Sequence, residues 1–108
     1  MQFQSIQIRE IQNLEEHAKD VFLGTVELKF RENIGGVDVG QVISVQSRIS
    51  HKTSATFSSL ESAFFSECHR LLEHAARLLE QESLESLRQQ ERAARESEQA
   101  KWNAGLPS

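Results

Sequence analysis

The chain has 108 residues, of which 38% are hydrophobic and 26% charged, and its formal net charge is −4 at pH 7. A chain of this length can bury only one modest core, so we expect a small folded protein with no separate catalytic domain. The acidic balance repels phosphate backbones, which disfavours non-specific binding to nucleic acid.

The N-terminal segment combines two periodicities. Ile6 and Ile8 alternate with Gln7, which is typical of a strand. Apolar residues at helical spacing follow: Ile8, Ile11, Leu14, Ala18 and Val21. Asn13 and Glu16 resemble a capping box, and Gly24 stands where a helix would end. We therefore predict a strand over 2–9 and a short N-terminal helix over about 10–22.

An alternating pattern then indicates an antiparallel sheet. Apolar residues alternate with polar or charged residues over 25–31, and the odd-numbered residues of 37–57 are mainly apolar. Between these segments, residues 33–40 contain three glycines. One strand over 37–57 would be far longer than usual, so we expect strands near 41–48 and 52–57. The short glycine-rich connection predicts an antiparallel β-hairpin or three-stranded meander.

A long amphipathic helix is predicted to follow the strands. Ser58 and Glu61 resemble a second capping box, and neither glycine nor proline occurs again before Gly105. An apolar stripe runs along this segment: Leu60, Phe64, Cys68, Leu71, Ala75 and Leu78. The predicted fold class is α+β, in which this C-terminal helix packs on the sheet.

The second half of that helix has no obvious core of its own. A helix over 58–100 would be about 64 Å long, roughly twice the span of a small domain. We therefore predict an α+β core domain over 1–82 and an exposed helical extension with a flexible tail over 83–108. The predicted partner-binding residues lie in that extension: Leu84, Leu87, Arg88, Glu91, Arg95 and Trp102.

Metal, cofactor and catalytic sites are not predicted. Metal-binding side chains crowd together only at Cys68, His69, Glu73 and His74, where His69 and Glu73 alone share a helix face. Serines and histidines are present, so a Ser/His pair remains open, but no recognisable nucleophile motif occurs. The glycines in the 33–40 segment lead into a strand, which favours a hairpin over a phosphate-binding loop. We expect a protein that is not an enzyme.

Three functions follow as hypotheses. The first is a non-enzymatic protein–protein interaction or assembly protein, expected to be a homodimer. The second is a small acidic regulator or inhibitor that binds a basic protein surface through acidic residues of the C-terminal half: Glu80, Glu82, Glu85, Glu91, Glu96 and Glu98. The third is a small-molecule-binding or enzymatic domain with a pocket between sheet and helix.

The expected location is the cytoplasm. The N-terminus lacks the basic start and continuous apolar run of a signal peptide, and no stretch of 18 consecutive apolar residues occurs. The lone Cys68 excludes an intramolecular disulfide and is consistent with a reducing compartment. We expect neither a membrane partner nor a nucleic-acid partner.

Overall fold

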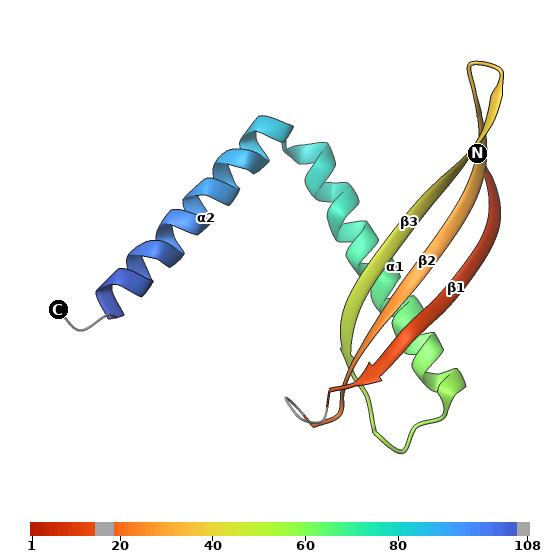
Figure 1. The fold of residues 1–108 in the computed structure, drawn as a ribbon, viewed down its shortest axis with the longest axis horizontal. Helices are drawn as coiled ribbons and strands as arrows, with labels where there is room; N and C mark the ends of the chain where they lie inside the picture. The colour runs from red at the N-terminus through yellow and green to blue at the C-terminus, as the bar shows by residue number, and fades with distance from the viewer. Residues whose placement is uncertain (15–18, 106–108) are drawn as a thin grey trace. The chain divides into compact units, whose positions relative to one another are not determined.

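Three strands precede two helices in the computed structural model, which describes residues 1–14 and 19–105 (Figure 1). The elements are β1 (Gln2–Asn13), β2 (Val21–Ile34), β3 (Val37–Ser50), α1 (Phe57–Gln81) and α2 (Leu84–Gly105). The chain divides into two compact units, residues 1–72 and residues 73–108. The α+β class and the antiparallel sheet are confirmed.

The sheet has the order β1-β2-β3, with both neighbours antiparallel to the central strand. β2 and β3 pair without a register shift from Val21 opposite Ser50 to Ile34 opposite Val37. Gly35 and Gly36 form the two-residue turn between them, with φ angles of 61° and 85°. Such a turn requires positive φ at both positions, which is why two glycines stand there.

The predicted N-terminal helix over 10–22 is wrong. Residues 10–13 belong to β1 and residues 21–22 to β2, whereas residues 15–18 lie outside the described part of the chain. The helical spacing has a different cause, which is a register shift in β1 between Arg9 and Gln12. This β-bulge inserts one residue, so Ile8 and Ile11 face the same side of the sheet although they are three positions apart.

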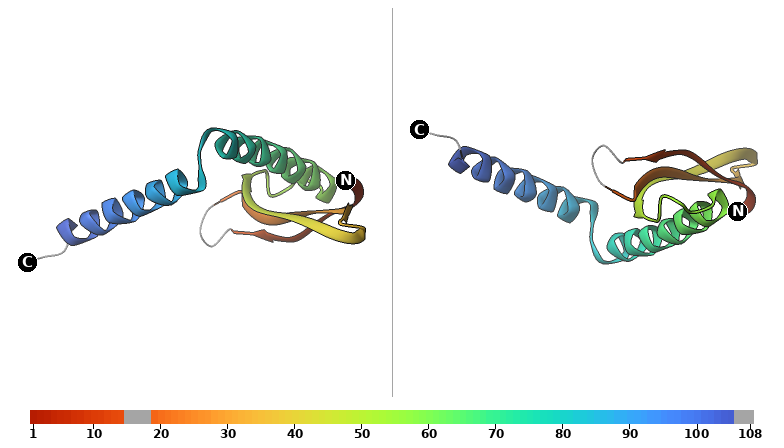
Figure 2. Two further views of the ribbon diagram at one scale, coloured as in Figure 1. Left: turned by 90° about the horizontal axis from the view of Figure 1, so that it is seen from above. Right: turned by 90° about the horizontal axis from the view of Figure 1, so that it is seen from below.

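The first unit has its core between one sheet face and the first turns of α1 (Figure 2). Its buried hydrophobic residues come from β2, β3 and α1: Phe22, Val26, Ile49, Leu60, Phe64 and Cys68. The Phe64 side chain is completely buried. Gly24, predicted to end a helix, instead lies in β2 directly against the Phe64 ring. The first three residues of the predicted apolar stripe, Leu60, Phe64 and Cys68, therefore pack on the sheet, and Leu72 packs against the same core.

The single long C-terminal helix is replaced by two helices. α1 ends at Gln81 and α2 begins at Leu84. Ser83 caps α2, because its Oγ accepts a hydrogen bond of 3.0 Å from the Ser86 N–H. Thr56, not Ser58, caps α1, accepting a hydrogen bond of 3.2 Å from the Ser59 N–H. Because a Ser at an N-cap favours a new helix start, Ser83 is the residue of the sequence that indicates the break between α1 and α2.

A loop over residues 51–56 replaces the strand predicted near 52–57. Three hydrogen bonds to Asp20, which lies just before β2, hold this loop. The Thr53 N–H donates to Asp20 Oδ1 at 3.2 Å, and the Thr53 hydroxyl donates to the same oxygen. The His51 N–H donates to the Asp20 carbonyl oxygen at 2.9 Å. The backbone bond between His51 and Asp20 continues the β2–β3 pairing by one residue pair, and the Asp20 side chain then holds the loop through Thr53.

Removing the Thr53 hydroxyl should change the acid stability of this loop. The hydrogen bonds from Thr53 hold the pKa of Asp20 below its usual value of 3.8. A depressed carboxyl pKa stabilises the fold above the unfolded pKa, and this contribution is lost as pH falls through the folded value. We expect Thr53→Val to raise the Asp20 pKa and flatten the loss of stability below pH ~4. NMR titration of Asp20 and urea unfolding between pH 2 and 7 would measure both, and an unchanged pKa would contradict the assignment.

Candidate interaction surfaces

An apolar pocket opens beside the core of the first unit. It has a volume of about 160 Å³ and is lined by Ile6, Val26, Leu28, Phe65, Cys68, His69 and Leu72. The Phe65 side chain at its edge is 56% exposed, and Phe3 on the same sheet face is also 56% exposed. Pockets for drug-sized ligands usually measure roughly 300–1,000 Å³. The pocket therefore suits one apolar side chain better than a substrate.

The thiol in this pocket is poorly suited to nucleophilic chemistry. Cys68 is buried, and this burial raises the pKa of its thiol. The thiolate is the reactive form, so a raised pKa leaves less of it at neutral pH. Cys68 acts as a small core residue here, while His74 from the same sequence cluster is exposed.

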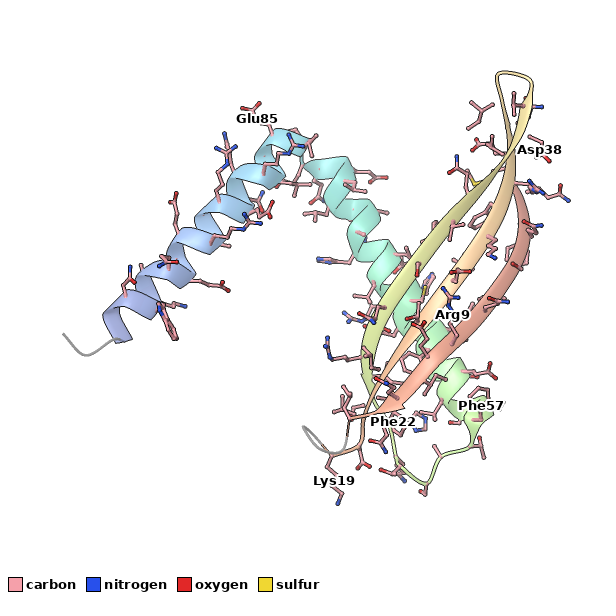
Figure 3. All side chains as sticks on the ribbon, in the orientation of Figure 1. Arg9, Lys19, Phe22, Asp38, Phe57 and Glu85 are labelled. Carbon is pink, nitrogen blue, oxygen red and sulfur yellow. The ribbon has the colours of Figure 1, made fainter. Side chains whose placement is uncertain are left out.

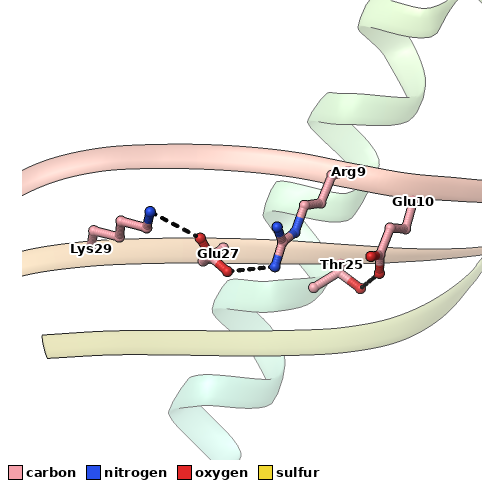
Figure 4. A network of polar contacts seen from close by, with 5 residues as sticks. All are labelled: Arg9, Glu10, Thr25, Glu27 and Lys29. Atoms are coloured by element: carbon pink, nitrogen blue, oxygen red, sulfur yellow. Dashed lines mark hydrogen bonds and ion pairs between the residues drawn. The ribbon is translucent and has the colours of Figure 1, made fainter.

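The opposite face of the sheet carries a polar network (Figure 4). Glu27, in the middle of β2, is buried, and its carboxylate lies 2.6 Å from Arg9 Nη2 and 3.6 Å from Lys29 Nζ. Thr25 Oγ1 lies 3.5 Å from Glu10 Oε2. Buried charges persist where they are paired, and Glu27 has two cations beside it. This network stabilises the strands and holds no group in a reactive arrangement.

The structure brings one Ser/His pair together. Ser59 Oγ lies 2.9 Å from His51 Nε2 across the loop that joins β3 to α1. A catalytic histidine is normally oriented by a carboxylate on its other nitrogen. His51 Nδ1 instead lies 3.4 Å from the carbonyl oxygen of Lys52, and the Asp20 carboxylate accepts from Thr53. The Ser59–His51 contact holds the loop against the start of α1. The two residues are eight positions apart in the sequence, a spacing that matches no known motif and therefore did not predict the contact.

The six predicted partner-binding residues all lie on α2. Their spacing places them along one stripe of the helix: Leu84, Leu87, Arg88, Glu91, Arg95 and Trp102. Leu84 is 65% exposed and Trp102 is 67% exposed. Arg95 Nη2 lies 2.5 Å from Glu91 Oε1, which is the usual pairing one turn apart.

α2 carries no excess of acidic charge. Its four acidic residues are Glu85, Glu91, Glu96 and Glu98, and its four basic residues are Arg88, Arg92, Arg95 and Lys101. Of the other acidic residues that the regulator hypothesis used, Glu82 accepts a hydrogen bond of 2.7 Å from the Ser86 hydroxyl. The helix therefore lacks the concentrated negative surface that would attract a basic protein.

Among the residues that the structure describes, no group of three or more His, Cys, Asp or Glu side chains could hold a metal ion. Within the same residues, neither helix is sufficiently long and apolar to cross a bilayer. Comparisons with protein families, with curated proteins and with solved structures gave no match to this chain.

Proposed function

We propose that this protein is a non-enzymatic interaction or assembly protein that binds another protein chain through the stripe on α2. The observation that carries the proposal is the exposure of this helix. None of the residues Leu84–Asn103 is buried, although Leu84, Leu87 and Trp102 are large and apolar. Large aromatic residues contribute most to protein interfaces when a partner covers them.

The physical chemistry of helices supports this proposal. Isolated helices are only marginally stable in water, and most helical stability in proteins comes from packing of an apolar face. α2 has local support from the Ser83 cap and the Glu91–Arg95 ion pair. Each of these contributes about 1 kcal/mol or less. A partner that buries Leu84 and Trp102 would supply the packing.

Site-specific photo-crosslinking tests the proposal. A benzophenone amino acid replaces Trp102 or Leu84 on the stripe in the full chain, and replaces Ala93 or Ala100 on the opposite face as matched controls. We expect crosslinks to a second copy or to a foreign protein from the first two positions only, because only that stripe lies in contact. Equal crosslinking from both faces, or none from either, would contradict the proposal.

A further inference from the structure

β3 is an edge strand with an unusually regular free edge. It forms the outer strand of the β1-β2-β3 sheet, and its ladder with β2 shows no register shift. β1, the other edge, has shifts between Phe3 and Ser5 and between Arg9 and Gln12. Bulges at an edge disrupt the row of free backbone groups and so discourage pairing with another chain. β1 has this protection and β3 does not.

Charged side chains also protect the edge at β1 and not the edge at β3. β1 carries Arg9 and Glu10 next to each other at its second bulge, where Glu10 has a φ of 58°. β3 carries only Asp38 and Arg48, near its two ends, and residues 39–47 are uncharged. Charged side chains in mid-strand are a common protection of natural sheet edges. The middle of β3 is therefore open to another strand.

We propose that β3 pairs in antiparallel orientation with β3 of a second copy, so that two sheets join into one about a two-fold axis. Two-fold dimers use the same surface on both chains, and an edge strand can serve as such a surface. This contact is separate from the α2 stripe. It therefore adds a second interface to the assembly function proposed above.

The turn at Gly35–Gly36 decides which backbone groups face outward. In a two-residue hairpin the residues flanking the turn, here Ile34 and Val37, form a hydrogen-bonded pair. Such pairs alternate along an antiparallel ladder, so the odd-numbered residues of β3 bond to β2. The even-numbered residues then direct their N–H and C=O groups to the free edge. A second β3 must therefore align even-numbered residues with even-numbered residues.

Several registers align even-numbered residues with even-numbered residues, and charge complementarity selects one of them. Asp38 and Arg48 are both even-numbered and lie on the same sheet face. When Asp38 faces Arg48 of the second copy, symmetry creates the reciprocal pair and sets Ile43 opposite Ile43 of the second copy. Figure 3 shows Asp38 close to the hairpin end of β3. Asp38 is accessible, because its side chain is 68% exposed and its ion pair with Arg31 is long, at 3.6 Å.

The side chains near the proposed axis suit this contact. Ile43 is 40% exposed and Val42 is 57% exposed, although both lie in mid-strand. In the selected register Ile43 contacts its own copy on the face that packs against α1. Val42 faces Ser44 of the second copy on the opposite face. Apolar cross-strand pairs stabilise antiparallel sheets.

Charge reversal tests the register. Light scattering coupled to size exclusion should show a dimer for the full chain, and sedimentation should give its dissociation constant. Asp38→Lys places one lysine opposite Arg48 in each of the two symmetric pairs, so we expect a rise of about tenfold in that constant. Arg48→Glu should have a similar effect, and the double variant Asp38→Lys/Arg48→Glu should restore dimerisation. A double variant as weak as the single variants would overturn the register.

A matched pair of variants tests the edge. Ser44 and Gln7 both lie opposite Glu27, Ser44 on β3 and Gln7 on β1. Each replacement by lysine therefore has the same neighbour within the chain. We expect Ser44→Lys to weaken the dimer, because two ammonium groups would lie diagonally across the axis, and Gln7→Lys to leave it unchanged.

The outcomes separate this proposal from the one for α2. A full chain that is monomeric at high micromolar concentration overturns β3 pairing and leaves binding of a foreign protein by α2 intact. A dimer weakened by Leu84→Ser but not by Ser44→Lys also overturns β3 pairing. A dimer weakened by Ser44→Lys but not by Gln7→Lys or Leu84→Ser supports β3 pairing, whatever the crosslinking from α2 shows.

Discussion

Phe64→Ala should lower the free energy of unfolding by about 3–5 kcal/mol, the usual cost of removing a large buried aromatic side chain. Phe64 is completely buried in a core that has few buried residues. Small domains are stabilised by only about 5–15 kcal/mol in total, so a loss of this size would remove a large share of that stability. Urea unfolding followed by circular dichroism at 222 nm would measure it.

The neighbouring phenylalanine provides the control for this experiment. Phe65 is adjacent on α1 but 56% exposed, so Phe65→Ala removes the same atoms from a position that solvent already reaches. We expect it to cost less than about 1 kcal/mol. Equal losses for the two variants would show that the core is not centred on Phe64.

Gly24→Ala should destabilise the protein by about 1–3 kcal/mol, although alanine normally fits a strand better than glycine. A Cβ atom at this position would lie 2.7 Å from Phe64 Cζ, 2.8 Å from Cε1 and 3.0 Å from Cε2. These distances are too short for carbon atoms, and the buried ring has little room to move. The strand or the helix would have to shift, and the same unfolding experiment would detect the cost.

Gly40→Ala is the matched control, because Gly40 also lies within a strand and a Cβ there would meet nothing within 4 Å. We expect no loss of stability, and a gain of up to about 1 kcal/mol. The double variant Gly24→Ala/Phe64→Leu should be more stable than the sum of its single changes predicts, because the smaller side chain makes room for the new methyl group. Strict additivity would contradict a direct contact between residues 24 and 64.

The sequence was sufficient for features that depend on residues close together in the chain. The alternation over 25–31 and 41–48 predicted two strands that the structure contains, and the glycines of the 33–40 segment predicted the turn between them, because side-chain periodicity and turn chemistry are local. The apolar stripe of the helix likewise predicted its packed face, and it contains the buried residues Leu60, Phe64 and Cys68. The stripe on α2 was also visible as a pattern, and its role as a binding surface remains a prediction.

Only the tertiary structure decided features that depend on pairing between distant segments. Ile8 and Ile11 have helical spacing, but the bulge after Arg9 makes that spacing consistent with a strand once β2 pairs alongside. Gly24 had the appearance of a helix end, and its actual role depends on Phe64, which is forty positions away in the sequence. The free edge of β3 is likewise a property of the sheet order. β3 has β2 on one side and no strand on the other, so the backbone groups on that other side are unpaired.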